Sequence, residues 1–159
     1  MVGFKDAETI ANSELLVLAC DISVPAAIED RIVRANAADI KARIIVEGAN
    51  APTTLEVDKI LNDNGIFVVP GMLANAAGVV VSYFEWGQYL QAFLWSEYEV
   101  NRQLQTVMGN TFHEVLEMSQ HRKVDMRNAA YTLAIKRIAD VWKPGEYSHS
   151  STKGSKHRS

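Results

Sequence analysis

Two asparagines, Asn50 and Asn75, have side chains that could hold an uncharged polar ligand. A carboxamide offers two donor hydrogens and an acceptor without a charge, so it suits a ligand carboxamide or a ribose. Each asparagine follows a short run, residues 44–47 and 66–69, that is typical of a buried strand. The alternative, which the pattern favours about equally, is that both asparagines cap helices.

The positions of these side chains depend on three predicted strands, at residues 22–24, 44–47 and 66–69. Each is followed by a turn of small residues or proline and then by sequence of helical character, which is the alternation of a parallel α/β sheet. Ligands bind outside the carboxyl ends of such strands. We therefore expect residues 25–27, 48–50 and 70–71 on one rim, with Asn75 close behind.

The connecting segments are predicted to be helical. Residues 28–41 have weak helical spacing, and residues 54–64 form an amphipathic pattern with Thr53 and Glu56 spaced as a capping box. Asn64-Gly65 should end that helix. After Pro70, the expected elements are one long helix over 72–94, a helix from the Ser96 cap to about residue 121, and a last helix capped by Asp125.

Ser82 lies seven residues, close to two helical turns, after Asn75, and Val79 falls on the same face. This spacing would let the Ser82 hydroxyl bind a substrate carboxylate. The more common behaviour of such a serine is a hydrogen bond to the preceding turn of its own helix.

Three other features indicate structural roles. Cys20 is expected to be a small core residue. The pattern of His113, Glu114 and Glu117 lacks the second histidine of a metalloprotease motif, so we expect a solvated helix face. Glu47 ends a strand on the rim and could orient backbone or amide groups.

Composition excludes several classes of function. The net charge of −3 argues against a nucleic-acid surface or a basic membrane patch, and no uncharged apolar run is long enough to span a membrane. One cysteine permits no internal disulfide and favours a reducing compartment, and the first residues do not read as a signal peptide. We therefore expect a cytoplasmic protein.

The phosphate-binding motifs of nucleotide enzymes are missing from the sequence. There is no Gly-x-Gly-x-x-Gly turn, no phosphate loop and no visible pairing of a nucleophile with a base. Residue chemistry alone therefore indicates only half of a dinucleotide site.

Residues 46–54 and 75–86 closely resemble the C-terminal part of glutamate dehydrogenase, within the glutamate/leucine/phenylalanine/valine dehydrogenase family. Residues 20–27 resemble the same family's preceding strand and turn, and the similarity runs from about residue 3 to residue 142. The resemblance implies a partial Rossmann-like α/β sheet, the second half of a dinucleotide-binding domain, followed by long C-terminal helices.

The resemblance also implies NAD(P)-dependent oxidative deamination of L-glutamate to 2-oxoglutarate and ammonia, with NAD or NADP as cofactor and a homo-oligomer in the intact family. It assigns roles to six residues: Ala27 and Ala49 line the nicotinamide–ribose side, Asn50 and Asn75 hydrogen-bond the cofactor, and Val79 and Ser82 contact the substrate.

The family's catalytic lysine and aspartate and its glycine-rich turn have no counterpart in this sequence, so we expect a fragment that transfers no hydride alone. The predicted division is a partial NAD(P)-binding domain over 1–71, a helical segment over 72–142 and a disordered tail over 143–159. The alternatives are a non-catalytic regulatory module that associates with dehydrogenase subunits, or a product that scarcely folds because its sheet is truncated.

Three positions depart from the family pattern. Ala51 and Ala77 stand where the family usually has glycine, and Gly71 stands where it usually has an acidic residue. Alanine for glycine is harmless inside a helix but unfavourable where φ must be positive.

Overall fold

The computed structural model describes residue 5 and residues 8–142. Three short parallel strands, β1 (Ile22–Ser23), β2 (Ile44–Val46) and β3 (Phe67–Val69), form a sheet in the order β1-β2-β3. Ile44 pairs with Ile22 on one side and with Phe67 on the other. The predicted parallel α/β sheet is therefore confirmed.

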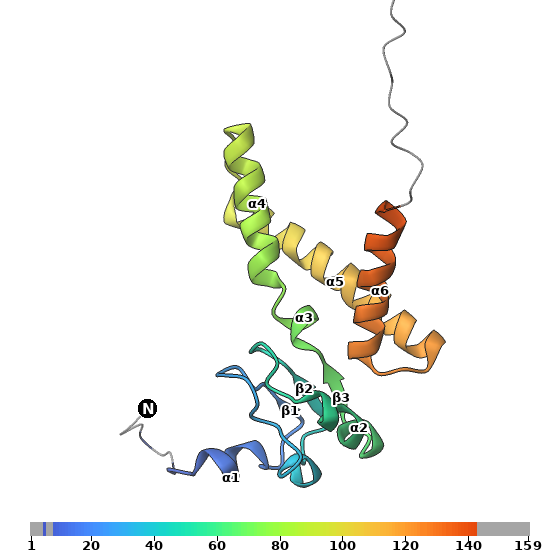
Figure 1. The fold of residues 1–159 in the computed structure, drawn as a ribbon. Helices are drawn as coiled ribbons and strands as arrows, with labels where there is room; N and C mark the ends of the chain where they lie inside the picture. Colours follow the sequence, from blue (N-terminus) through green and yellow to red (C-terminus); the bar gives the residue numbers. More distant parts are fainter. Residues whose placement is uncertain (1–4, 6–7, 143–159) are drawn as a thin grey trace, which may run out of the picture.

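Helices precede, connect and follow the strands: α1 (Asn12–Leu16), the short 3₁₀ helix η1 (Ala37–Asp39), α2 (Leu55–Asp63), α3 (Gly71–Ala74), α4 (Ala77–Gln91), α5 (Glu97–Arg122) and α6 (Met126–Val141). Figure 1 shows the sheet with α1 and α2 at one end of an elongated molecule, and α4, α5 and α6 extending from it. No helix within the described ranges is long and apolar enough to cross a membrane.

The buried apolar residues form two clusters. The first surrounds the sheet and α2 and consists of Ile32, Ala37, Ile40, Ala42, Ile45, Val57, Leu61 and Ile66. The second joins α3, α5 and α6 and consists of Leu73, Val115, Met126, Ala129 and Ala130. The predicted boundary at residues 71 and 72 remains a prediction, and the predicted tail over 143–159 lies outside the described residues.

The predicted helix over 28–41 is wrong, because only η1 within it is helical. Asp30 has a left-handed backbone with φ 52°. The N–H groups of Arg31 and Ile32 donate to the carbonyl of Pro52 at 2.8 Å, and Ile32 pairs with Thr53 in an isolated parallel bridge. Bonds to a distant loop satisfy these backbone groups, so the weak helical spacing does not produce a helix.

The single helix predicted over 72–94 is also wrong. Helix α3 ends at Ala74, Asn75 follows with φ −96° and ψ 0°, and α4 begins at Ala77. The Asn75 N–H donates to the Gly71 carbonyl at 2.9 Å, which closes α3 after one turn. Asn75 and Ser82 are therefore not on one continuous helix, and the two-turn spacing between them does not apply.

The capping box predicted for Thr53 and Glu56 is wrong as well. The N-cap of α2 is Thr54, whose side chain makes no capping bond. The hydroxyl oxygens of Thr53 and Thr54 are buried and have no hydrogen-bond partner among the described residues.

The helix caps predicted at Ser96 and Asp125 are confirmed. The Ser96 side chain accepts from the Glu99 N–H at 3.3 Å, and Asp125 accepts from the Asn128 N–H at 2.8 Å. Helix α5 ends at Arg122, one residue beyond the predicted end. Gly65, which follows α2, has φ 74°, the left-handed conformation expected there.

Candidate functional site

The two asparagines meet at the carboxyl ends of the strands. The Asn75 Nδ2 donates to the Asn50 Oδ1 at 2.8 Å. Asn50 lies in the turn after β2, and Asn75 lies at the break between α3 and α4. Because the bond uses one donor and one acceptor, the pair retains chemical capacity for further donor and acceptor contacts.

The turn after β1 lies beside the turn after β2. The carbonyl of Pro25 accepts from the N–H groups of Gly48 and Ala49 at 3.1 and 3.0 Å. A Cβ on Gly48 would lie 2.9 Å from the Ala26 Cβ, so only glycine permits this approach. The structure thus brings the turn with exposed Ala27 next to the turn with Ala49 and Asn50.

Val79 and Ser82 lie on α4, and both are exposed; Val79 is 75% exposed. Among the described residues, the Ser82 hydroxyl forms no hydrogen bond with the preceding turn, unlike Thr106 and Thr132, which do bond back to their own helices. No hydrogen bond in the described chain joins Ser82 to the amide pair.

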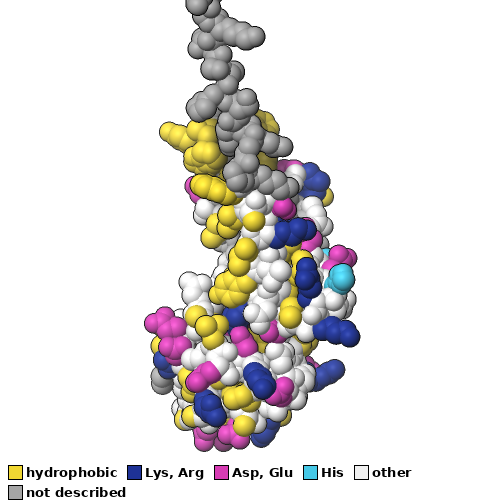
Figure 2. Space-filling view, turned by 45° about the vertical axis from the view of Figure 1, so that its right-hand side comes forward, with side chains coloured by type: hydrophobic (Ala, Val, Ile, Leu, Met, Phe, Trp, Pro, Cys, Tyr) yellow, Lys and Arg dark blue, Asp and Glu magenta, His cyan; other side chains and the backbone are white. Residues whose placement is uncertain are grey.

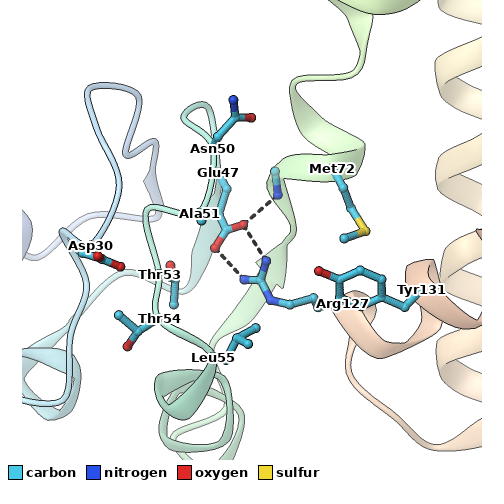
Figure 3. Close-up of a pocket in the computed structure, with 11 residues that line it drawn as sticks. Asp30, Glu47, Asn50, Ala51, Thr53, Thr54, Leu55, Met72, Arg127 and Tyr131 are labelled. Carbon is cyan, nitrogen blue, oxygen red and sulfur yellow. Dashed lines mark hydrogen bonds and ion pairs between the residues drawn. The ribbon is translucent and has the colours of Figure 1, made fainter.

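Sequence reasoning missed a buried ion cluster behind the amide pair. Figure 3 shows Arg127 of α6 reaching Glu47, which follows β2. Its Nη2 and Nη1 donate to Glu47 Oε1 and Oε2 at 2.6 and 3.0 Å. Its Nε and Nη2 also donate to Asp58 of α2 at 2.6 and 3.1 Å. Because 80 residues separate Glu47 from Arg127, no local sequence pattern indicates the pair.

The cluster carries two negative charges and one positive charge. Burial raises the pKa of Asp58, although hydrogen bonding and charge from Arg127 lower it in part. Burial lowers the pKa of Arg127, but hydrogen bonds to Glu47 and Asp58 outweigh this and raise it above its ordinary value. A guanidinium that donates to two carboxylates keeps its proton at any working pH.

A cavity of about 430 Å³ adjoins the cluster and the turn after β2. Its lining includes Asn50, Glu47, Arg127 and the buried hydroxyl-bearing Thr53. Ala27 lines a different cavity, of about 620 Å³, near α1. Of the six residues predicted for the site, Asn50 thus lines the first of these two cavities and Ala27 lines the second.

Two expectations about other side chains have clear outcomes. Cys20 is exposed, so the expectation of a core cysteine is wrong. His113 is exposed, and its Nδ1 lies 2.7 Å from the Gly109 carbonyl, while Glu114 pairs with Arg137 across α5 and α6. The exposed side chains of His113, Glu114 and Glu117 agree with a solvated helix face. The described residues contain no group of three or more His, Cys, Asp or Glu side chains that could hold a metal ion.

Comparison with known proteins gives one consistent family. The profile of the glutamate/leucine/phenylalanine/valine dehydrogenases matches residues 2–144. The chain is 53% identical over 134 residues to the cryptic catabolic NAD-specific glutamate dehydrogenase of Bacillus subtilis, covering 84% of this chain and 31% of that protein. It is 55% identical to the NAD-specific glutamate dehydrogenase of Staphylococcus aureus, covering 84% and 32%.

Solved structures agree with the sequence comparison. The hetero-hexameric glutamate dehydrogenase of Thermus thermophilus is similar with a TM-score of 0.81 and 29% identity, over 87% of this chain and 33% of that one. The glutamate dehydrogenase of Peptoniphilus asaccharolyticus is similar with a TM-score of 0.71 and 39% identity, over 74% and 30%. The chain thus spans about a third of the length of the relatives it matches.

Proposed function

The chain belongs to the glutamate/leucine/phenylalanine/valine dehydrogenase family, and from that premise we propose that it forms part of an NAD-dependent glutamate dehydrogenase. The whole protein would deaminate L-glutamate oxidatively to 2-oxoglutarate and ammonia. The proposed contribution of this chain is one wall of the nicotinamide site, with the helices that support it.

The observation that carries the proposal is the hydrogen bond between Asn75 and Asn50 at the carboxyl ends of parallel strands. In an open parallel sheet this is where dinucleotides bind. The amide pair suits a nicotinamide carboxamide or ribose, because both partners exchange donors and acceptors without charge. The donor set at this rim therefore fits the cofactor's nicotinamide end.

When bound, NAD supplies the acceptor for the hydride of the amino acid. In this proposal Asn50 and Asn75 orient the nicotinamide end, while Ala27 and Ala49 present small side chains to its ribose side. Val79 and Ser82 would face the substrate, with the Ser82 hydroxyl on its side-chain carboxylate.

We propose NAD rather than NADP, because two similar relatives are named NAD-specific. Since the chain spans about a third of those relatives, we also propose that the 159 residues alone bind the cofactor without transferring hydride. The single cysteine favours a reducing compartment, so the proposed location is the cytoplasm, and the proposed assembly is a homo-oligomer.

Cofactor titration tests the proposal. NADH should bind the purified chain, and Asn75→Ala and Asn50→Ala should each weaken binding by about tenfold, the effect of losing one good hydrogen bond. Asn110→Ala, an exposed asparagine of α5, is the matched control and should bind as the unaltered chain does. Equal affinity in all four proteins would contradict the assignment of the amide pair.

A glutamate-dependent assay tests the second part. NAD and L-glutamate incubated with the purified chain should give no NADH above the protein-free background. A rate above background that Asn75→Ala abolishes would overturn the proposed inactivity of the isolated chain.

One observation favours a second candidate, a non-catalytic module that associates with dehydrogenase subunits. Val79, Tyr83, Trp86 and Leu90 lie along one face of α4 at helical spacing and are between 57% and 75% exposed. Figure 2 shows hydrophobic side chains gathered toward the upper end of the molecule, while charged side chains are interspersed over the lower end. An apolar stripe of this kind is typical of a helix that packs against a partner.

The occupant we propose is a subunit of the same family, since the glutamate dehydrogenase of Thermus thermophilus is a hetero-hexamer. Mixing the chain with a full-length relative should give a complex in size-exclusion chromatography, and Trp86→Ser with Leu90→Ser should abolish it. A complex that survives both substitutions would exclude the α4 stripe as the contact.

A further inference from the structure

The buried ion cluster lies between the amide pair and α6. The Glu47 side chain is 0% exposed and that of Arg127 is 10% exposed. Charged side chains are rarely buried to this degree unless they are paired. Removing one partner of such a pair leaves the other uncompensated, so the cluster makes the position of Glu47 depend on α6.

Glu47 has a second partner besides Arg127. Its Oε2 accepts from the backbone N–H of Gly71 at 2.7 Å, and the same oxygen accepts from Arg127 Nη1 at 3.0 Å. Figure 3 shows both bonds converging on this carboxylate. Glu47 thus fixes the start of α3 as well as the end of β2.

These contacts continue into the amide pair. The Gly71 carbonyl accepts from the Asn75 N–H at 2.9 Å, and the Asn75 side chain donates to Asn50. Asn50 lies three residues after Glu47, so the contacts close into a ring. A Cβ on Gly71 would lie 2.9 Å from the Ala49 carbonyl oxygen, which shows how tightly the ring is packed.

The Glu47 side chain acts only as a hydrogen-bond acceptor in this ring. A carboxylate accepts at both oxygens, whereas a protonated carboxyl would direct a hydrogen toward one of the three N–H donors that now point at it. Arg127 supplies the positive charge that lies against the buried Glu47 carboxylate, with N–O distances of 2.6 and 3.0 Å.

We propose that Arg127 is a positioning residue for the nicotinamide rim: acting through Glu47, it holds the Gly71 N–H and thereby sets the geometry of the Asn50–Asn75 pair. The effect of Arg127 on cofactor binding rests on the proposed function, whereas its effect on the geometry of the Asn50–Asn75 pair does not. In the described part of the chain, no hydrogen bond joins Arg127 to either asparagine, and its proposed effect passes through Glu47 and Gly71.

The test compares the full chain with Arg127→Met and Arg127→Lys, at a temperature where circular dichroism shows each protein folded. The first readout is the NMR resonance and hydrogen-exchange rate of the Asn75 side-chain amide, and the second is NADH affinity. Arg127→Met should shift the resonance, speed exchange and weaken NADH binding by about tenfold. Arg127→Lys keeps the charge but loses the bidentate geometry. Its Asn75 amide resonance, exchange rate and NADH affinity should therefore lie between those of the unaltered chain and those of Arg127→Met.

The matched control is Arg137→Met, which removes another α6 arginine from a half-exposed pair with Glu114. It should leave the Asn75 amide and NADH affinity as in the unaltered chain. An unchanged Asn75 amide in Arg127→Met, or equal changes in Arg137→Met, would overturn the proposal. Failure of both Arg127 variants to fold would also overturn it, since Arg127 would then be required for folding rather than for positioning.

The two readouts separate this proposal from the proposed function. If the unaltered chain binds no NADH while Arg127→Met still shifts the Asn75 amide, the cofactor assignment fails and the positioning role stands. If NADH binds equally to all variants and the amide is unchanged, the positioning role fails and the cofactor assignment stands.

Discussion

At the scale of single residues, the turn after β2 depends on one unfavourable backbone conformation. Ala51 has φ 46°, in the left-handed region that costs an alanine about 1–2 kcal/mol. The turn that holds Asn50 for its bond with Asn75 is therefore built with some strain at the next residue. Ala77, by contrast, begins α4 and is not among the residues with positive φ.

Substituting glycine for each of these two alanines should change the free energy of unfolding in opposite directions. Ala51→Gly should raise the free energy of unfolding by about 0.5–1 kcal/mol, because relief of strain exceeds the added entropy of the unfolded chain. Ala77→Gly should lower it by up to about 1 kcal/mol through helix propensity. Urea denaturation measures both, and a loss of stability in Ala51→Gly as large as in Ala77→Gly would contradict the left-handed turn.

At the scale of elements, helix starts in this chain are set in two ways. Asp125 caps α6 through its side chain, accepting from the Asn128 N–H. Helix α2 begins after Thr54 without any side-chain cap, and a backbone bridge between Thr53 and Ile32 fixes the chain just before it. Similar cap residues thus serve different purposes, depending on what the preceding backbone already contacts.

This difference predicts opposite outcomes for two substitutions. Asp125→Ala should lower the free energy of unfolding by about 1 kcal/mol, the usual cost of a lost cap. Thr53→Val keeps the side-chain shape and removes a buried hydroxyl without a partner in the described chain, so it should be neutral or stabilising. Thermal unfolding followed by circular dichroism distinguishes the two variants. If Thr53→Val lost as much stability as Asp125→Ala, the Thr53 hydroxyl would have to form the capping bond that the sequence predicted.

At the scale of the whole molecule, the ion cluster joins the two apolar cores. Asp58 follows the core residue Val57 of the sheet cluster, and Arg127 follows Met126 of the helical cluster. A direct ion pair between these neighbours couples the sheet end of the molecule to α6. This polar contact adds to the apolar packing of Val69 of β3 against the helical cluster in holding the helices and the rim together.

The raised pKa of Asp58 gives this contact a dependence on pH. Because the pKa in the folded state lies above the ordinary 3.8, the folded state takes up the proton first as the pH falls. The contribution of Asp58 to the free energy of unfolding is therefore flat at neutral pH and rises as the pH falls through the interval above 3.8.

Asp58→Asn removes this contribution, so the unaltered chain should gain stability relative to the variant as the pH is lowered through that interval. Urea denaturation at a series of pH values measures the difference. The control is Asp63→Asn, which removes an exposed aspartate of the same helix and keeps Asp58. Its free energy of unfolding should change with pH as that of the unaltered chain does. A difference that shrinks or stays constant as the pH falls would show that Asp58 does not titrate above its ordinary range.

The sequence by itself determined the parallel sheet and the two C-terminal helices with their caps at Ser96 and Asp125. It gave the meeting of Asn50 with Asn75, which the structure shows, as one of two equally favoured alternatives. These features are predictable because they depend on short-range patterns: apolar runs, cap residues and the rule that parallel strands end on one edge. The family assignment likewise followed from two continuous motifs in the right order.

Only the tertiary structure decided the remaining features. Residues 28–36 form no helix because the N–H groups of Arg31 and Ile32 bond to the distant Pro52 carbonyl. Asn75 interrupts a helix that its own neighbours favour. The pairing of Glu47 with Arg127 joins side chains 80 residues apart. Such contacts leave no periodic trace in the sequence, because each is fixed by the close approach of segments that only the folded chain brings together.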